Sequence, residues 1–291
     1  MRIFLAVTLL ALSGIASGLE SALPAAQQQP APRQSLLSDM RSAIASGQPA
    51  TARAHAARLL WQLDPTPEEA RAARLVVIDS HLAEQQGAVA FRAMLRFDQD
   101  YRPLDRATAG HFVARLLNLG HPKEAVNWLA ALDDASPLKL RLLLHAGLVK
   151  PDAAIARARA RAAKGGGAEW WRVLADAAEK GGDGTLAVEA QEQLLDAGEP
   201  ATELWQAYDR EARAAANQHK LLAGDDGAWF ELARRPAVRP ARSRALLAYL
   251  SRHAADRETR LRAQVRHVHS LQQGSLERAA VQVYERYLKN G

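Results

Sequence analysis

Apolar residues recur at steps of three and four along most of the chain from Ser35 onward, and short breaks separate these runs. The leucines Leu246, Leu247 and Leu250 are one example. This period is that of a helix with one apolar face, and no stretch alternates convincingly between apolar and polar residues as a half-buried strand would. Prolines cluster at the breaks, several where a first helical turn would begin. The pattern predicts an all-α fold with helices at 35–46, 50–63, 67–86, 88–99, 104–119, 122–134, 138–147, 151–164, 168–180, 184–197, 201–222, 226–234, 240–254, 256–273 and 275–289.

One pattern of four residues occurs three times along the chain. A glycine is followed five residues later by an alanine, twelve residues later by a leucine, and seventeen or eighteen residues later by a proline. A turn residue, a small contact residue, an apolar anchor and a stop are the parts of one helical-hairpin repeat. The three sets are Gly47, Ala52, Leu59 and Pro65; Gly120, Ala125, Leu132 and Pro137; and Gly182, Ala187, Leu194 and Pro200.

Residues 168–201 resemble a tetratricopeptide repeat. In this resemblance Trp171, Leu174, Ala175 and Ala178 line the first helix, Gly182 and Asp183 form the turn, and Ala187 and Leu194 line the second helix. Residues 112–137 are a second match, 36–65 a weaker third, and 274–287 a degenerate terminal unit. The resemblance implies an α-solenoid of stacked antiparallel helix hairpins, because one pair of helices cannot bury its apolar face alone. Such stacks offer a concave surface to a partner.

The spacing of the repeats is irregular. The turn glycines straddle the period of about 34 residues that tetratricopeptide repeats keep, without holding to it. We therefore predict an irregular α-solenoid over 35–291, whose best units are 112–137 and 168–201. Irregular helical arrays of this composition are also similar to the superhelical arm of soluble lytic transglycosylases. The turn glycines are Gly47, Gly87, Gly120, Gly147, Gly182, Gly224 and Gly274.

The first residues are typical of an export signal. Arg2 is followed by an apolar core from Ile3 to Ile15 and by small residues up to Gly18, which predicts a signal peptide over 1–18 with cleavage after Gly18. An uncleaved N-terminal anchor is the alternative. Residues 19–34 contain three prolines and four glutamines, so we predict a flexible leader there. The chain has no cysteine, which excludes a lipid-anchored cysteine and disulfides. We expect a periplasmic protein with no integral membrane domain after cleavage.

Positive charge restricts the range of partners. The formal net charge is +6, and arginines gather at 157–161 and 233–245. An excess of positive charge favours anionic partners such as acidic polysaccharides. An exported protein seldom meets nucleic acid, so we expect no nucleic-acid role. A contact with an anionic glycan stays open.

Catalytic and metal-binding motifs are absent from the sequence. No nucleophile elbow, phosphate loop, zinc-protease motif or dinucleotide fingerprint occurs. His267 and His269 are two residues apart, which points them to different sides of a helix rather than toward one metal ion. His253 lies one helix earlier. We therefore expect no metal, no cofactor and no enzymatic activity.

Tryptophans and arginines supply the candidate contact residues, because both are enriched at binding hot spots. Trp171, Trp61 and Trp128 fit interior positions of their helices. Trp170 and Trp171 are adjacent and cannot both face inward, so one of them is free to reach a groove. The predicted partner contacts are Trp170, Trp205, Arg239 and Arg242.

Together these features predict a non-enzymatic scaffold that is exported and holds a protein of the cell envelope, or an extended peptide, on a concave helical-repeat surface. The alternative is a glycan-binding accessory arm of cell-wall or exopolysaccharide machinery. An enzyme with an unfamiliar site is a third hypothesis, and it requires a deep pocket with convergent carboxylates.

Overall fold

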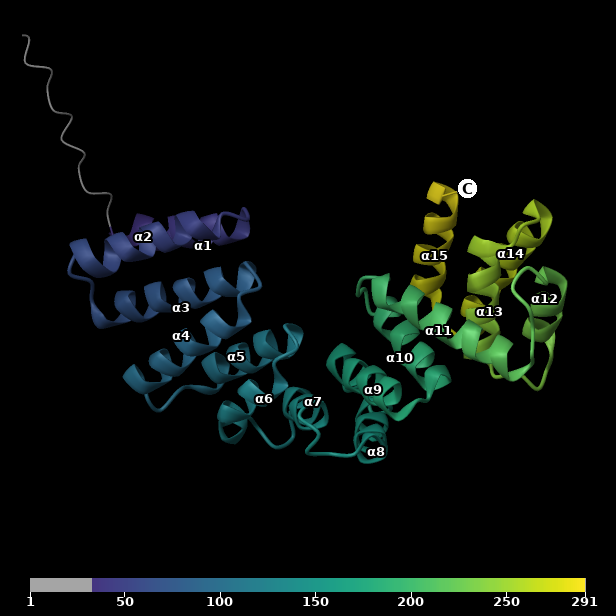
Figure 1. The fold of residues 1–291 in the computed structure, drawn as a ribbon, viewed down its shortest axis with the longest axis horizontal. Helices are drawn as coiled ribbons and strands as arrows, with labels where there is room; N and C mark the ends of the chain where they lie inside the picture. Colours follow the sequence, from purple (N-terminus) through teal and green to yellow (C-terminus); the bar gives the residue numbers. More distant parts are fainter. Residues whose placement is uncertain (1–32, 291) are drawn as a thin grey trace, which may run out of the picture. The chain divides into compact units, whose positions relative to one another are not determined.

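The computed structural model describes residues 33–290, and over this range the chain is all-helical, with fifteen α-helices, one 3-10 helix and no strand (Figure 1). The predicted signal peptide and all but the last two residues of the predicted leader lie outside the described residues. The α-helices are α1 (Arg33–Ala45), α2 (Pro49–Gln62), α3 (Pro67–Ala83), α4 (Gly87–Asp100), α5 (Arg106–Asn118), α6 (Pro122–Ala125), α7 (Pro137–His145), α8 (Pro151–Ala162), α9 (Ala168–Gly181), α10 (Gly184–Asp196), α11 (Thr202–Gln218), α12 (Asp226–Arg234), α13 (Pro240–His253), α14 (Arg257–Gln273) and α15 (Glu277–Asn290).

Each predicted helix has a counterpart in the structure, and the clearest difference lies at 122–134. There α6 ends at Ala125 and a 3-10 helix, η1 (Val126–Ala131), follows it. The tighter turn carries Trp128 into the core, where its ring packs edge-on against Phe112 at 5.2 Å and Phe91 at 6.1 Å. The prediction of a continuous α-helix over 122–134 is therefore wrong. The switch from α-helix to 3-10 helix accompanies the packing of the Trp128 ring into the core.

The chain divides into two compact units, Met1–Val76 and Val77–Gly291, with the division inside α3. In the first unit α1 and α2 pack against each other and bury Leu36, Met40 and Leu59. Trp61 does not join this core. It lies on the last turn of α2 and is 84% exposed, which corrects the expectation that it is interior.

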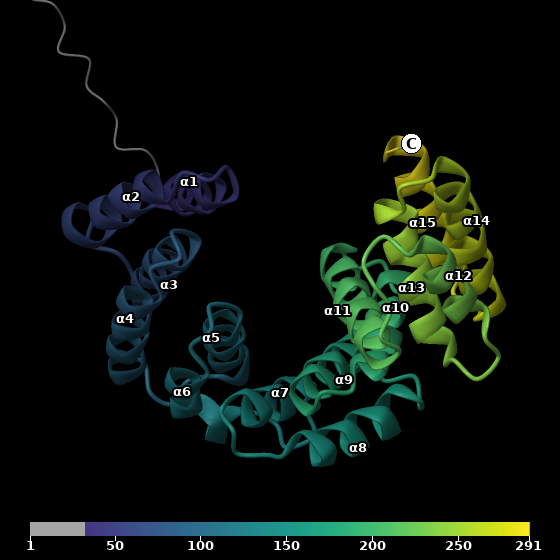
Figure 2. The same cartoon turned by 45° about the vertical axis from the view of Figure 1, so that its right-hand side comes forward.

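In the second unit, helices that follow one another in the sequence pack against one another. Helix α8 packs on α9, α9 on α10, α10 on α11, α11 on α13, α13 on α14, and α14 on α15 (Figure 2). Helix α10 also contacts α13 and α15. Side-chain caps begin several helices, as Asp183 accepts from the Leu186 N–H at 3.0 Å and Asp256 from the Thr259 N–H at 2.8 Å. No described helix combines the length and apolarity needed to cross a membrane.

The glycine pattern corresponds to real turns. Gly47, Gly120 and Gly182 have φ of 72°, 77° and 77°, a left-handed conformation that strains any residue with a side chain. Their partner alanines and leucines are buried. Sequential packing of the helices is confirmed, whereas the irregular solenoid of stacked hairpins stays a prediction. The buried partners are Ala52, Ala125, Ala187, Leu59, Leu132 and Leu194.

Candidate partner-binding groove

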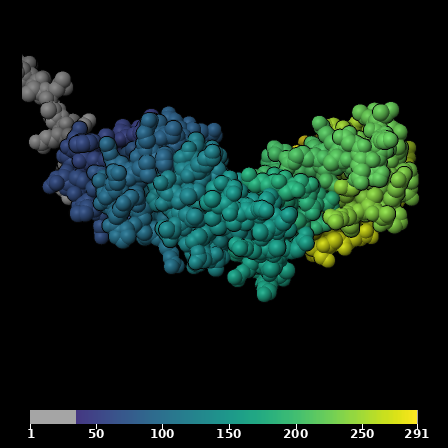
Figure 3. Space-filling model, turned by 60° about the horizontal axis from the view of Figure 1, so that its bottom comes forward, coloured from purple at the N-terminus to yellow at the C-terminus, as the bar shows by residue number. Residues whose placement is uncertain are grey.

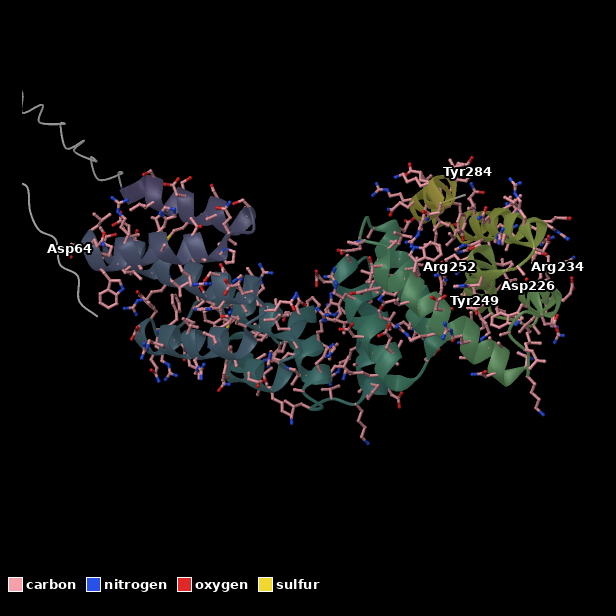
Figure 4. All side chains as sticks on the ribbon, turned by 45° about the horizontal axis from the view of Figure 1, so that its top comes forward. Asp64, Asp226, Arg234, Tyr249, Arg252 and Tyr284 are labelled. Carbon is pink, nitrogen blue, oxygen red and sulfur yellow. The ribbon has the colours of Figure 1, made fainter. Side chains whose placement is uncertain are left out.

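A groove of about 920 Å³ lies between the end of α13 and the helices α14 and α15. Figures 1 and 2 show α14 and α15 side by side, and Figure 4 labels Arg252 of α13 and Tyr284 of α15, which both line the groove. Apolar and basic side chains dominate the lining. Its residues are Ser251, Arg252, Arg257, Arg260, Leu261, Gln264, Val265, Val268, His269, Gln272, Tyr284, Arg286, Tyr287, Leu288 and Asn290.

Helix α14 carries two apolar faces. Ala263 and Leu271 face the core together with His267 and are buried. Leu261 and Val265 lie four residues apart on the groove side, where Val265 is 70% exposed. An amphipathic helix needs one apolar stripe to pack against its own fold, so the second stripe of α14 is apolar surface that the fold itself leaves uncovered.

Helix α15 repeats this arrangement. Ala280 and Val283 are buried, whereas Tyr284 and Leu288 are exposed and line the groove. Exposed apolar patches rimmed by polar residues mark interaction sites in proteins of this size. The two helices therefore present their unused apolar stripes to one shared groove.

Beside the groove, two arginines lie over one buried ring. The guanidinium carbons of Arg252 and Arg286 lie 4.8 Å and 4.4 Å from the ring centre of Trp205. Arg252 also forms an ion pair of 2.5 Å with Asp209. Arg286 has no carboxylate partner among the described residues, and burial, together with the nearby Arg252, lowers its pKa. This region thus holds more positive than negative charge.

Trp205 was predicted to contact a partner, and the structure corrects this. Its ring is buried, and its Nε1–H has no hydrogen-bond partner among the described residues. The arginines that cover it, and not the ring, reach the groove. Trp205 therefore supports the wall of the groove from beneath.

A buried ion pair anchors the core below the groove. Arg244 of α13 donates two hydrogen bonds to Glu192 of α10, from Nε at 2.7 Å and from Nη2 at 2.6 Å. The Tyr208 hydroxyl donates to the same carboxylate at 2.9 Å. Burial raises the pKa of the Glu192 carboxyl, against the opposing effect of Arg244. Burial and the Glu192 charge raise the pKa of Tyr208.

His267 extends this network to the groove. Its Nε2 lies 3.1 Å from the Tyr208 oxygen and its Nδ1 lies 2.6 Å from the Tyr287 oxygen. Because the Tyr208 proton goes to the Glu192 carboxylate, Tyr208 must accept from His267 Nε2–H, and Tyr287 must then donate to Nδ1. Burial, with Arg244 and Arg252 nearby, lowers the pKa of His267 to about 3. His267 is thus a neutral residue of the core, a role that the sequence alone did not predict.

The other predicted contacts lie elsewhere in the second unit. Arg242 forms an ion pair of 2.6 Å with the buried Glu211 and so joins α13 to α11. Arg239 is exposed and lies 3.9 Å from Asp183. Neither lines the groove. No group of His, Asp and Glu among the described residues could hold a metal ion.

Trp170 lines a second cavity of about 620 Å³, formed by α7, α8 and the start of α9. Arg157, Arg161 and Lys164 line it from α8 and the residues just after it, and Arg161 lies 5.9 Å from the Trp170 ring centre. The surface of α8 is turned toward the viewer in Figure 3. Trp170 is half-buried, and Trp171 is too, although we predicted the latter to be interior.

The groove itself was not predicted from the sequence. The second apolar stripe of α14 was visible at Leu261, Val265 and Val268, but a sequence alone does not tell which stripe the fold covers. No family model matches this chain, and neither a curated protein nor a solved structure does. The resemblances stated above stay predictions, and the geometry and charge of the groove carry the argument about function.

Proposed function

We propose that this protein is an exported, non-enzymatic scaffold that binds a segment of another cell-envelope protein in the groove of α13, α14 and α15. The observation that carries the proposal is the pair of apolar stripes on α14 and α15, which the fold leaves exposed in one groove. The sequence predicted binding on a concave surface of the whole helical array, and the proposal places it in the groove of these three helices.

Two further features support a binding role. The groove combines apolar stripes on α14 and α15 with basic and polar side chains, and an apolar groove can bind the apolar face of an amphipathic peptide segment. The network of Glu192, Arg244, Tyr208 and His267 reaches Tyr287 and Ser251, two residues that line the groove. Because these hydrogen bonds are buried, they hold the groove-lining helices in fixed positions, and a preformed surface costs less to order on binding.

Cross-linking from one groove position tests the proposal. We expect a photoreactive amino acid in place of Val265 to give one dominant protein adduct in envelopes of the source cell, because this side chain points into the partner site. Mass spectrometry of the adduct should map it to one segment of one protein. Leu261→Gln in the same chain should abolish the adduct by removing apolar surface next to the probe.

Val281 is the matched control. It is also a valine, it lies on α15 and is 56% exposed, but it does not line the groove. The same probe at Val281 should give no such adduct. Equal adducts from both positions, or no protein adduct from Val265, would contradict the proposal.

The cavity beside α8 favours a second candidate function, the binding of an anionic glycan. Arg157, Arg161 and Lys164 have no carboxylate partner among the described residues, and Trp170 adds an aromatic edge. If the protein binds an anionic glycan there, the double variant Arg157→Gln, Arg161→Gln should be retained severalfold more weakly on an immobilised polyuronate. Added salt should weaken the retention further. Arg159→Gln is the control, since Arg159 is exposed on α8 outside the cavity. Equal losses in both variants would reject the alternative.

A further inference from the structure

We infer that the segment bound in the α13–α15 groove is an amphipathic helix whose polar face is acidic. This inference rests on the proposed function and adds the shape and charge of the partner. Three observations carry it: the length and spacing of the apolar stripes, the all-helical surroundings, and the one-sided charge of the groove lining.

The stripes have the size and spacing of a helix-binding surface. The groove-lining residues of α14 run from Arg257 to Gln272, which at 1.5 Å per residue corresponds to about 22 Å, or about four turns of a bound helix. Tyr284 and Leu288 of α15 form the facing wall. A helix with apolar residues at every third and fourth position inserts into such a groove with its own side chains.

An extended partner strand has nothing to pair with here. Strand addition needs a sheet edge with free backbone N–H and C=O groups. Residues 33–290 contain no strand, and the backbone groups in the middle of α14 and α15 are used inside their own helices. Recognition in this groove therefore relies on side chains, which favours a helical occupant.

The charge of the lining specifies the charge of the partner. Arg252, Arg257, Arg260 and Arg286 line the groove, and no aspartate or glutamate is among the described residues that do. Of these four arginines, only Arg252 has a carboxylate partner among the described residues, namely Asp209. Carboxylates on the rim of a bound helix would supply the missing partners, and such complementary charges steer association and select partners.

Two other occupants fit the charges less well. A second copy of this chain docked groove to groove would bring the same four arginines face to face, and like charges across an interface are unfavourable. The chain's own residues 1–32 carry one acidic residue, Glu20, and one basic residue, Arg2. That segment offers no acidic face. The complementary occupant is a separate acidic helix.

Matched synthetic helices test the inference on the full chain. The probe is a fluorescent four-turn peptide with a leucine stripe and glutamates on its other faces, and two companions carry glutamine or lysine at every glutamate position. We expect fluorescence anisotropy to show that the glutamate peptide binds about tenfold tighter than the glutamine peptide, and that the lysine peptide does not bind. Salt should reduce this preference.

Variants of the groove locate the effect. Arg257→Gln and Arg286→Gln should each weaken the glutamate peptide about threefold while leaving the glutamine peptide nearly unchanged. Leu288→Gln should weaken both peptides, because it removes apolar surface. Arg278→Gln is the matched control, since Arg278 is exposed on α15 but does not line the groove.

The outcomes separate the inference from the function on which it rests. Equal affinity for the glutamate and glutamine peptides, lost in Leu288→Gln, would overturn the acidic partner but leave a groove that binds protein segments. A dimer that the peptide dissociates would identify a second copy as the occupant. Tighter peptide binding after removal of residues 1–32 would identify that segment instead. Each of these results, and the absence of any peptide binding, would overturn the inference, whereas the Val265 cross-link tests the proposed function independently.

Discussion

Replacement of Arg244 by methionine is expected to lower the free energy of unfolding of the second unit by about 3–5 kcal/mol. Arg244 and Glu192 are both buried and joined by two hydrogen bonds of 2.7 Å and 2.6 Å. Methionine leaves the Glu192 carboxyl buried with only the Tyr208 hydroxyl as a partner, so it must either keep an unpaired charge or take up a proton. Urea unfolding followed by tryptophan fluorescence measures the loss, and amide exchange locates it in α10 and α13.

Two further variants define what the loss means. The double variant Glu192→Leu with Arg244→Met should recover most of the stability, because an apolar pair of similar volume leaves no buried charge. Arg239→Met is the surface control, because Arg239 is exposed and its ion pair with Asp183 is long, at 3.9 Å. Its effect should stay within about 0.5 kcal/mol. An Arg244→Met loss as small as that of the control would show that the buried pair is not what holds α13 to α10.

The helices were predictable because their signals are local. Each apolar period spans one helix, and glycines or prolines end most of them, so a short window of sequence contains the information. The turn at Gly182 is an example, since its left-handed backbone and its buried neighbours Ala187 and Leu194 lie within one hairpin. The short 3-10 helix after α6 was not predictable, since it accompanies the packing of Trp128 on Phe91 and Phe112.

The buried network was out of reach of such reasoning. Arg244 and Glu192 are 52 residues apart, and His267 and Tyr208 are 59 residues apart. Each of these residues alone is typical of a solvated helix face, and only the packing of α10, α11, α13 and α14 brings them together.

The tryptophans show the same limit of prediction from sequence. Trp205 was predicted as a contact and is buried, whereas Trp61 was predicted as core and is exposed.

The network and the groove are two sides of the same helices. His267 lies on the buried face of α14, whose other face carries Leu261 and Val265 into the groove. Tyr287 does both tasks, since its hydroxyl bonds to His267 and its side chain lines the groove. A change that loosens the network is therefore expected to affect the geometry of the groove as well.

Acid is expected to destabilise the second unit through His267, by about 2 kcal/mol between pH 7 and pH 5. Burial lowers the pKa of His267 to about 3 in the folded chain, against about 6.5 in an exposed chain. Below pH 6.5 the unfolded state therefore takes up a proton that the folded state cannot, so stability is fully present above pH 6.5 and falls as the pH falls. The slope approaches about 1.4 kcal/mol per pH unit until the pH nears 3. Urea midpoints measured at several pH values give this slope.

The variant His267→Gln isolates this proton from every other acid-sensitive group. Its amide can donate to Tyr208 and accept from Tyr287 as the neutral imidazole does, but it does not titrate. The stability difference between the parent chain and the variant should therefore shrink by about 2 kcal/mol from pH 7 to pH 5. His219→Gln, at an exposed histidine near the end of α11, should keep the pH slope of the parent. A difference between parent and His267→Gln that stays constant with pH would mean that His267 titrates alike in the folded and unfolded chain, and that water reaches the hydrogen bonds beneath the groove.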